Sequence, residues 1–565
     1  MNTLYKKYIP FKPVKLAQRK WPGNVTTQAP IWCSVDLRDG NQALVEPMNL
    51  EEKLTFFSAL VIMGFKEIEI GFPAASQVEF DFTRALIERG LIPPDVTVQV
   101  LTQARDHLIR RTYEALEGCD RAIVHLYTNI SAFFRQVVYR TDLEGVIHMA
   151  EKGARLMVEL AKARPDGGAG IRFEFSPEAF SGSDPDHSVA LCQRMLDAFE
   201  ATPEKKLILN LPATVETASP NCFADQVEYF IDHLQGRDRA IISVHTHNDR
   251  GTGVADAEMA MLAGAQRVEG TLFGNGERTG NCDLVTVALN LYTQGVDPQL
   301  DFTHLSHMRA LYERLTKMRV PERQPYVGDL VFTAFSGSHQ DAIKKGFDYR
   351  REHDMPMWQM PYLIIDPQDL GRSYEPIIRI NSQSGKGGAA YMLQSHFGYN
   401  LPKAMHADFG AAVQREADRL GKELTADQLL RLFVGEYCQS DSPYRLLSHD
   451  ITERGAAGHS VVRFTGVIAY RHREYPLCGE GNGPIDAFFS AMQEAHIDGF
   501  TFRGYHEHAI GGGSDAKAVA YIELEYKGRN VFGVGIERNV SIASIKGVLS
   551  AINRALNLEE AQHGA

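Results

Sequence analysis

The sequence lacks the features of a membrane protein or of a disulfide-stabilised protein. No window approaches about 18 uninterrupted apolar residues, so no membrane span is predicted. The cysteines number seven, lie scattered and form no CxxC pair, which argues against a disulfide framework and a cysteine-based zinc site. Residues 1–24 are basic without an apolar core, so we expect no secretory signal. These absences predict a cytoplasmic protein.

An excess of positive charge is missing as well. Lys and Arg number 59 against 71 Asp and Glu, which gives a formal net charge of −12 over 565 residues. Nucleic acids and anionic membrane surfaces select basic patches, so we expect neither as a partner. Hydrophobic residues make up 44% and charged residues 23%, as in ordinary globular proteins.

Signatures of several enzyme classes are also missing. The sequence contains neither the HExxH motif of metalloproteases nor the GxSxG motif of serine hydrolases. Three Gly-rich stretches (residues 274–280, 384–386 and 479–483) each fail to complete a dinucleotide-binding or phosphate-binding motif. Nucleotide binding is therefore not supported.

From Ile31 onward, short β-branched runs alternate with longer helical patterns. The predicted strands are residues 31–36, 66–71, 97–101, 121–127, 170–175, 206–210, 240–246 and 267–272. Eight β-then-α units over roughly 270 residues favour an α/β fold of the (β/α)8 TIM-barrel type. The alternative, a doubly wound open sheet, would place a Gly-rich turn after the first strand, and residues 37–42 (LRDGNQ) lack it.

The remaining chain predicts further parts. We divide it into an N-terminal arm (1–30), the barrel (31–305), helical linker subdomains (306–436) and a C-terminal α+β domain (437–565). In the last part, two strand-like stretches are each followed by a GxG signature and a helix, and Gly479 and Gly533 stand 54 positions apart. This spacing predicts duplicated βββα modules. Their role is effector binding, dimerisation or purely structural, and we favour effector binding.

Residues 244–249 (VHTHND) carry the strongest chemical signal. His245 and His247 stand two apart at the end of the seventh predicted strand, so their imidazoles face the same side. The alternative role for either is a hydrogen-bonded core histidine. Asp39 follows the first strand, and all strand ends open at one mouth of a barrel. A carboxylate with two imidazoles suits Zn²⁺, Mn²⁺ or Mg²⁺ and leaves coordination positions for a substrate.

Other polar side chains recur where predicted strands end, as catalytic groups do in barrels. They are Arg38, His125, Tyr127, Glu174, Ser176, Glu178, Thr214 and residues 275–281. Arg38 stays protonated and suits either a bound carboxylate or enolate oxygen, or a structural ion pair. Ser176 is compatible with a helix N-cap that has Glu178 in its acidic first turn. Glu178 is equally a candidate active-site carboxylate.

Four segments together resemble the metal-dependent acyl-CoA aldol and Claisen enzymes. They are residues 36–42 (DLRDGNQ), 176–178 (SPE), 245–249 (HTHND) and 274–281 (GNGERTGN). That family includes 2-isopropylmalate, homocitrate and citramalate synthases and hydroxymethylglutaryl-CoA lyase. Residues 210–214 (NLPAT), 381–386 (NSQSGK) and the duplicated C-terminal modules are similar to the longer, bacterial and fungal 2-isopropylmalate synthase branch.

The resemblance implies a reaction and a metal. In this branch, acetyl-CoA condenses with 3-methyl-2-oxobutanoate and the thioester is hydrolysed to give 2-isopropylmalate, the first committed step toward leucine. Asp39, His245 and His247 would bind a divalent ion, with Asn281 as a fourth ligand or a close neighbour. Mg²⁺ is the expected ion, and Mn²⁺ or Zn²⁺ are the alternatives.

The resemblance also implies roles for the residues around the ion. Arg38 would stabilise the enolate of acetyl-CoA or the alkoxide that forms. Glu178 would belong to the acid–base group together with His339 and Tyr374, which in the family reach the partner subunit's barrel and so imply a homodimer. Five further residues would line the pocket for the 2-oxo acid or, as the alternative, serve ordinary packing at the barrel mouth. They are His125, Tyr127, Ser176, Pro212 and Thr214.

The resemblance leaves alternatives for the activity. Leucine would inhibit through residues 437–565. Homocitrate or citramalate synthases use other 2-oxo acids, and a lyase would run a related cleavage. A non-catalytic amino-acid sensor on an inactive barrel is the alternative from a different class, and the intact Arg38, Asp39 and His245 argue against it.

Overall fold

A computed structural model describes residues 4–8, 11–334, 336–374, 388–420, 424–438, 441–456, 459–470, 473–511 and 516–563. The polar segment 381–386 lies outside these residues. The chain forms two compact units, Met1–Phe332 with Ile364–Tyr374, and Thr333–Leu363 with Glu375–Ala565. In the described ranges, no helix combines the length and apolar character needed to cross a bilayer. The seven cysteines are free thiols.

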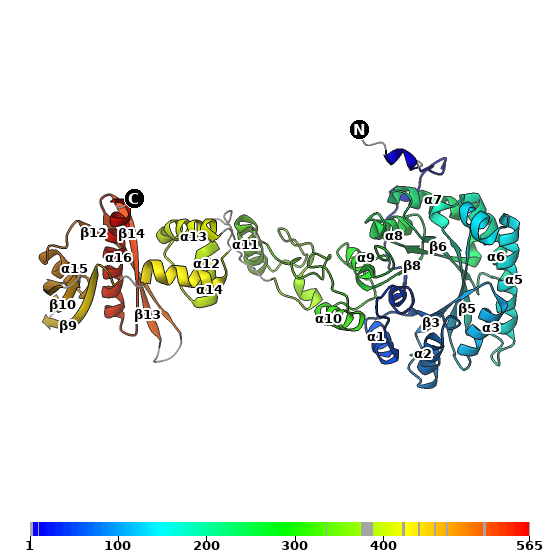
Figure 1. Cartoon of the computed structure of the whole chain (residues 1–565), viewed down its shortest axis with the longest axis horizontal. Coiled ribbons are helices and arrows are strands. Elements are labelled where there is room, and N and C mark those ends of the chain that lie inside the picture. The colour runs from blue at the N-terminus through cyan, green and yellow to red at the C-terminus, as the bar shows by residue number, and fades with distance from the viewer. Residues whose placement is uncertain are drawn as a thin grey trace. The chain divides into compact units, whose positions relative to one another are not determined.

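The first unit is a closed barrel of eight parallel strands, surrounded by helices (Figure 1). The strands are β1 (Ile31–Ser34), β2 (Glu67–Gly71), β3 (Thr97–Gln103), β4 (Ala122–Asn129), β5 (Ile171–Glu178), β6 (Leu207–Ala213), β7 (Ala240–Thr246) and β8 (Arg267–Gly270). The helices are α1 (Leu50–Ile62), α2 (Gln77–Glu88), α3 (Asp106–Ala115), α4 (Ala132–Phe134), α5 (Leu143–Lys162), α6 (Pro185–Ala198), α7 (Pro220–His233), α8 (Gly253–Leu262), α9 (Leu284–Tyr292) and α10 (Leu305–Thr316). The predicted (β/α)8 barrel is confirmed.

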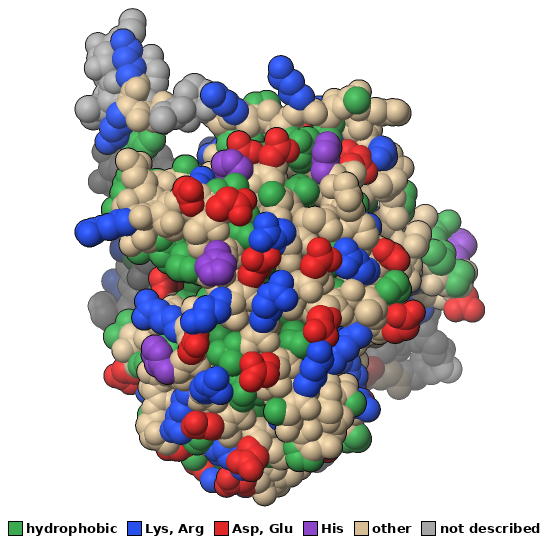
Figure 2. All heavy atoms as spheres, turned by 90° about the vertical axis from the view of Figure 1, so that its right-hand side faces the viewer, with side chains coloured by type: hydrophobic (Ala, Val, Ile, Leu, Met, Phe, Trp, Pro, Cys, Tyr) green, Lys and Arg blue, Asp and Glu red, His purple; other side chains and the backbone are tan. Residues whose placement is uncertain are grey.

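Local sequence signals account for these elements. Strands such as β2 and β6 are buried along their whole length, as expected for parallel strands covered by helices. Helix α1 begins with a capping box, in which Asn49 accepts from the Glu52 backbone and Glu52 accepts from the Asn49 backbone. Strand β1 pairs in parallel with both β2 and β8, which closes the barrel. On the face of this unit shown in Figure 2, acidic and basic side chains are interspersed.

The N-terminal arm is attached to the outside of the barrel. Arg19 donates two hydrogen bonds of 2.8 and 2.7 Å to the buried Asp225 of α7. The buried Trp21 donates from its indole nitrogen to Asp225 at 2.9 Å and from its backbone to Glu228 at 3.0 Å. The arm, which has no periodic structure, is thus fixed to α7 by hydrogen bonds from Arg19 and Trp21 to the carboxylates of Asp225 and Glu228.

The chain returns to the barrel unit after its excursion through residues 333–363. The Tyr292 hydroxyl of α9 donates to Asp369 at 3.0 Å, and Arg372 donates to the Tyr326 carbonyl at 3.1 Å. These contacts anchor residues 364–374 beside the helices that follow β8. Tyr374 therefore belongs to the barrel unit.

In its described residues, the second unit has the α-helices α11 to α14 followed by two repeated modules. Its elements are α11 (Gly337–His353), α12 (Gly388–Phe397), α13 (His406–Leu420), α14 (Ala426–Phe433), β9 (Tyr444–Ala456), β10 (His459–Tyr470), β11 (Arg473–Gly481), α15 (Pro484–Glu494), β12 (Phe500–Ile510), β13 (Lys517–Tyr526), β14 (Arg529–Glu537) and α16 (Val540–His563). The two antiparallel sheets are ordered β11-β10-β9 and β12-β13-β14. The predicted duplicated βββα modules are confirmed.

The GxG signatures serve helix packing in both modules. A Cβ on Gly479 of β11 would lie 2.3 Å from the Ala491 nitrogen of α15. A Cβ on Gly535 of β14 would lie 1.8 Å from the Ala543 oxygen of α16. Only glycine lets the helix backbone approach the strand this closely. The repeat at 54 positions is therefore explained by packing, not by a ligand.

A shared apolar core joins the helices of the second unit to the second module. Leu393, Phe409 and Phe433 of α12–α14 pack with Tyr521 of β13 and Phe532 of β14, and all five are buried. Helices α12, α13 and α14 therefore share one core with strands β13 and β14 of the second module.

Candidate active site

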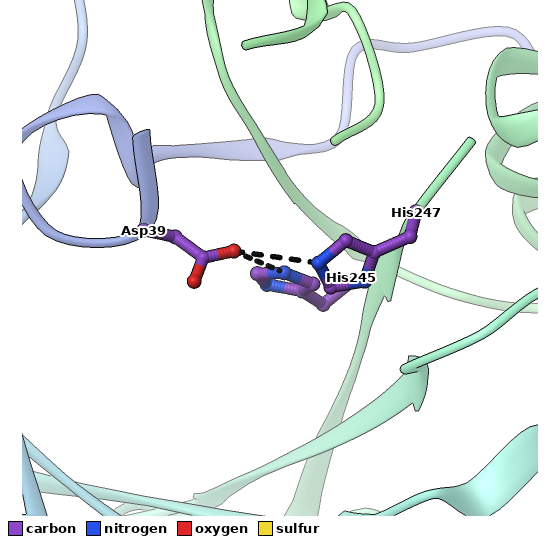
Figure 3. A group of neighbouring side chains, drawn as sticks. All are labelled: Asp39, His245 and His247. Carbon is purple, nitrogen blue, oxygen red and sulfur yellow. Dashed lines mark ion pairs between the residues drawn. The ribbon is translucent and has the colours of Figure 1, made fainter. Parts of the chain in front are cut away.

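Three candidate metal ligands converge at the mouth of the barrel. Asp39 lies on a helical turn, η3 (Asp36–Gly40), just after β1, while His245 is the penultimate residue of β7 and His247 follows the strand. Their nearest ligand atoms lie within 4.8 Å of one another, and all three residues are buried. Both imidazoles face the Asp39 carboxylate (Figure 3), with Nε2 to Oδ2 distances of 3.3 and 3.5 Å. The expected meeting of the first and seventh strand ends is confirmed.

The partners of the two histidines fix which ring nitrogen faces the site. His245 Nδ1 lies 2.8 Å from a Glu269 carboxylate oxygen, and His247 Nδ1 lies 3.3 Å from the Ala213 carbonyl. A proton on each Nδ1, donated to these acceptors, leaves the Nε2 lone pair directed at Asp39. This is the tautomer that a metal-binding histidine requires.

Asn281 offers a further candidate ligand beside His247. In the described part of the chain, Asp39 Oδ2 and Asn281 Oδ1 are buried acceptors without a hydrogen-bond donor. Asn281 pairs with His247 through a β-bridge, and its Nδ2 donates to the Asn275 carbonyl at 2.9 Å. A carboxylate, two imidazoles and an amide oxygen fit a divalent cation. The residues present therefore suit the metal that the sequence predicts.

Arg38 holds Asp39 in its charged form. The Arg38 guanidinium donates to Asp39 Oδ1 at 2.5 Å and also to Glu69 of β2. Burial alone would raise the pKa of Asp39, but the charge of Arg38 holds that pKa well below its ordinary value. Asp39 is consequently a carboxylate at neutral pH.

A cavity of about 250 Å³ opens beside these groups. Its lining includes all five residues expected to contact a 2-oxo acid, together with Arg38 and Glu178. The full lining is Arg38, Asp39, Gln42, Leu101, His125, Tyr127, Ser176, Glu178, Asn210, Pro212, Thr214, His245, His247, Glu277 and Arg278.

The end of β5 departs from one of the two expectations for Ser176. The strand continues through Glu178, because Ser176 and Glu178 pair with Tyr127 and Asn129 of β4. Ser176 is therefore not a helix N-cap, and its hydroxyl contacts His125 Nε2 at 2.7 Å. Burial raises the pKa of Glu178, while a hydrogen bond from Asn129 partly opposes that rise. Glu178 is thus a half-buried carboxyl that faces the cavity.

Two predicted residues from the linker do not line this cavity. His339 lies on α11 in the second unit, is exposed, and stacks on Tyr362 with ring centroids 4.0 Å apart. Tyr374 is half-buried at the end of the segment that returns to the barrel unit. Their expected role concerns the barrel of a partner subunit and stays a prediction.

Five lining residues were given no individual role from the sequence. Four of them lie inside segments that carry the family resemblance, so a closer reading of those segments would have found them: Gln42, Asn210, Glu277 and Arg278. Leu101 ends a predicted strand, but we considered only polar strand ends. Arg278 donates to Asp249 at 2.7 Å, and a loop contact of this kind leaves no periodic signal.

Comparisons with known proteins cover the whole chain. A family described as HMGL-like matches residues 29–311, one described as alpha-isopropylmalate synthase, post-catalytic domain-like, matches residues 329–394, and the LeuA allosteric (dimerisation) domain matches residues 423–556. A 2-isopropylmalate synthase of Clostridium acetobutylicum is 50% identical over 554 residues, which is 98% of this chain and 99% of the relative. Another from Pseudomonas fluorescens is 52% identical over 559 residues, covering 98% of each.

Solved structures similar to part of the chain include two lyases. Hydroxymethylglutaryl-CoA lyase from Pseudomonas aeruginosa aligns at a TM-score of 0.43 and 16% identity, covering 53% of this chain and 96% of the lyase. The HMG-CoA lyase from Brucella melitensis aligns at a TM-score of 0.41 and 15% identity, covering 52% of this chain and all of the lyase, 100%.

Proposed function

The chain belongs to the 2-isopropylmalate synthase family, and from that membership we propose the reaction and the residues that carry it out. The protein is an acyltransferase of leucine biosynthesis that condenses acetyl-CoA with 3-methyl-2-oxobutanoate and water to give 2-isopropylmalate and CoA. The observation that carries this proposal is the buried group of Asp39, His245 and His247 at the mouth of the barrel. The identity of the substrates is inferred from its full-length relatives, which are named 2-isopropylmalate synthase.

The reaction sets three chemical demands on the site. A proton leaves the methyl group of acetyl-CoA, and the carbon bonds to the keto carbon of the oxo acid. The keto oxygen becomes an alkoxide and then gains a proton. Water finally breaks the thioester C–S bond, which leaves a carboxylate and releases CoA as a thiol. The site must therefore move protons and stabilise negative oxygen.

Asp39, His245, His247 and Asn281 would hold a divalent ion, Mg²⁺ in the first place and Mn²⁺ or Zn²⁺ as alternatives. Bound there, such an ion would supply Lewis acidity to the oxo acid. Arg38 lines the same cavity and keeps its charge at all relevant pH values, so it can stabilise an enolate or alkoxide oxygen.

Glu178 is the proposed acid–base residue in the barrel. It lines the cavity, and burial raises the pKa of its carboxyl, which makes the carboxylate a stronger base than an exposed glutamate. His339 and Tyr374 are proposed to complete this acid–base group from the partner subunit. This assignment rests on the family and predicts that both residues act in trans.

The cavity wall offers the contacts that a branched 2-oxo acid requires. Polar groups of His125, Tyr127, Ser176 and Thr214 are proposed to orient the carboxylate end. Pro212 is proposed to contact the isopropyl group. Apolar lining on one side and hydrogen-bonding groups on the other are typical of small-molecule sites.

The C-terminal part is proposed to regulate the enzyme. Its match to the LeuA allosteric (dimerisation) domain supports leucine as an effector and a homodimer as the assembly. We retain the division into an arm (1–30), a barrel (31–305), linker subdomains (306–436) and a regulatory domain (437–565) as a proposal.

Release of CoA tests the function directly. A thiol reagent should report CoA when acetyl-CoA and 3-methyl-2-oxobutanoate are supplied together, and leucine should lower that rate. Pyruvate and 2-oxoglutarate serve as comparison substrates in the same assay. Release with either of them, and none with 3-methyl-2-oxobutanoate, would reassign the enzyme to citramalate or homocitrate synthesis.

A further inference from the structure

A closed ring of side chains lies beside and beneath the candidate metal centre. Its members come from η3, β2, β3, β7 and β8, and each contacts the next through a hydrogen bond or an ion pair. In order around the ring they are Arg38, Asp39, His245, Glu269, Gln99 and Glu69. The ring links one proposed metal ligand, His245, to the proposed oxyanion-binding residue, Arg38, by two separate routes.

The upper route is short and contains the metal ligands themselves. Arg38 donates to Asp39 Oδ1 at 2.5 Å, and Asp39 Oδ2 lies 3.3 Å from His245 Nε2. The lower route runs through the barrel interior, where Glu269 faces His245 Nδ1 at 2.8 Å and Glu69 accepts from the Arg38 guanidinium. Each buried carboxylate therefore orients one functional group.

Gln99 joins the two carboxylates. Its Nε2 donates to Glu69 Oε2 at 2.7 Å and to Glu269 Oε1 at 3.1 Å, and its Oε1 accepts from Arg267 Nη2 at 2.8 Å. Since an arginine can only donate, Arg267 settles which end of the amide faces which neighbour. Gln99 is fully buried, and both of its amide hydrogens and its oxygen are used.

The charges of the neighbours explain why an amide is suited to this position. Glu69 accepts from the Arg38 guanidinium, and Glu269 accepts from Arg267 Nη1 at 2.7 Å, so each carboxylate is paired with a cation. Like charges repel each other strongly in a buried interior, so a further charge between the two carboxylates would be unfavourable. A neutral group with two donors on one atom satisfies both and adds no charge.

We propose that Gln99 is a positioning residue, which fixes the angle between the metal-binding His245 and the Arg38 guanidinium by bridging Glu269 and Glu69. The proposal rests on the proposed function, because it assumes that His245 binds the metal and that Arg38 faces the reacting oxygen. Glu69 also contacts His125 Nδ1 at 3.0 Å, and Glu269 also accepts from Arg267 Nη1 at 2.7 Å and from Asn210 Nδ2 at 3.0 Å. Removal of the two amide hydrogens leaves these contacts in place and breaks the bridge between the two carboxylates. The orientation of His245 relative to Arg38 is then less closely fixed, so metal affinity and turnover fall together.

The full-length Gln99→Met variant tests the proposal. Methionine keeps the length and removes the donors and the acceptor. Titration calorimetry with Mn²⁺ alone should show roughly 10-fold weaker binding, and kcat for CoA release should fall roughly 10–100-fold, the usual range for groups that orient metal ligands. Gln226→Met is the matched control, because Gln226 of α7 is also buried but donates to the Ser181 carbonyl. It should leave both quantities unchanged.

The outcomes separate this proposal from the proposed function. Wild-type Mn²⁺ affinity in Gln99→Met, or a kcat within about twofold of wild type where roughly 10-fold or more is expected, would overturn the positioning role. Should circular dichroism show that the methionine variant is unfolded, Gln99→Glu gives the same readouts, because it keeps the acceptor for Arg267 and loses both donors. Wild-type protein that binds Mn²⁺ but releases no CoA with any oxo acid would contradict the function, and the Mn²⁺ affinities would still decide the role of Gln99.

Discussion

The interior of the barrel and the core of the C-terminal modules differ in the polarity of their buried side chains. Inside the barrel, Arg267, Glu69, Glu174 and Glu269 are completely buried and contact one another or other polar groups. The core of the two βββα modules consists of apolar side chains such as Phe488. Moving a charged group out of water costs several kcal/mol, whereas burying an apolar one is favourable.

The difference shows what each interior is for. Apolar contacts are non-directional, so the module core holds elements together without specifying the angle of any one side chain. Hydrogen bonds and ion pairs are directional, so the barrel interior can set the angles of Arg38 and His245. The barrel accepts a loss of stability where its chemistry needs orientation, whereas in the modules buried polar groups such as Arg554 and Asn553 of α16 stand beside a mainly apolar core.

Removal of a metal ligand should give the largest effect on the barrel side of this comparison. His245→Ala deletes one imidazole and leaves Glu269 without its partner, so CoA release should fall roughly 10³-fold or more, in line with the several kcal/mol that a Lewis acid supplies. Metal analysis of the purified variant should show loss of the bound ion. His233→Ala, an exposed histidine of α7, is the control. Wild-type turnover in His245→Ala would refute the metal assignment.

Overpacking should break the module core without touching the chemistry. Gly535→Ala places a Cβ 1.8 Å from the Ala543 oxygen, so urea unfolding of the second unit should show a loss of about 3 kcal/mol. Turnover without leucine should stay at the wild-type level, because the cavity lies in the barrel. Gly483→Ala, where a Cβ meets nothing within 4 Å, should change stability by no more than about 0.5 kcal/mol. Equal losses in the two variants would contradict this account.

The Glu178→Gln substitution in the barrel tests a proposed acid–base residue instead of a proposed metal ligand. The amide fills the same space but cannot take up a proton, so kcat should fall about 10²-fold. Burial raises the pKa of Glu178, so the wild-type rate should rise with pH along an acidic limb whose midpoint lies above the ordinary value of 4.5. A profile of kcat/KM against pH measures that midpoint. An unchanged limb in Glu178→Gln would assign the titration to another group.

The smallest expected effect compares carboxyls within the barrel unit. Burial and the neighbouring Glu216 raise the pKa of Asp256 to about 8, so the folded chain keeps a proton that the unfolded chain releases near pH 4. This contribution to stability is complete below pH 4 and is lost as pH rises through 8. Between pH 6 and pH 8, the free energy of unfolding should fall by about 1–2 kcal/mol more in wild type than in Asp256→Asn. Urea unfolding measures this, with exposed Asp238→Asn as a control that keeps the wild-type slope.

The barrel and the buried group of candidate metal ligands could be predicted because their signals are local. Eight β-branched runs separated by helical patterns specify the strands, and strand order then places Asp39 and His245 at one mouth. The duplicated modules were predicted because the GxG signatures that begin at Gly479 and Gly533 each follow a strand-like stretch and precede a helix. Each of these inferences needs only the sequence near the residue and the rule that barrel strands end together.

The polar contacts inside the barrel, including the ring that joins Arg38 to His245, could not be predicted in the same way. Glu67 and Glu69, like Arg267 and Glu269, stand two apart in apolar strands, a spacing that places each pair on one face. The sequence therefore contained this signal. It did not show which of these side chains meet across the interior, because closure of the barrel decides that. The role of Ser176 depended on a tertiary contact as well, since pairing with β4 extends the strand over a segment whose local sequence also permits a helix start.

The attachment of the arm has a consequence for synthesis of the chain. Arg19 and its acceptor Asp225 are separated by 206 residues. At roughly 5–20 residues per second, the ribosome releases Asp225 roughly 10–40 s after Arg19. Until then Trp21 has no burial site, and the arm is open to proteases. Cleavage within residues 11–24 therefore reports whether a nascent or damaged chain has folded as far as α7.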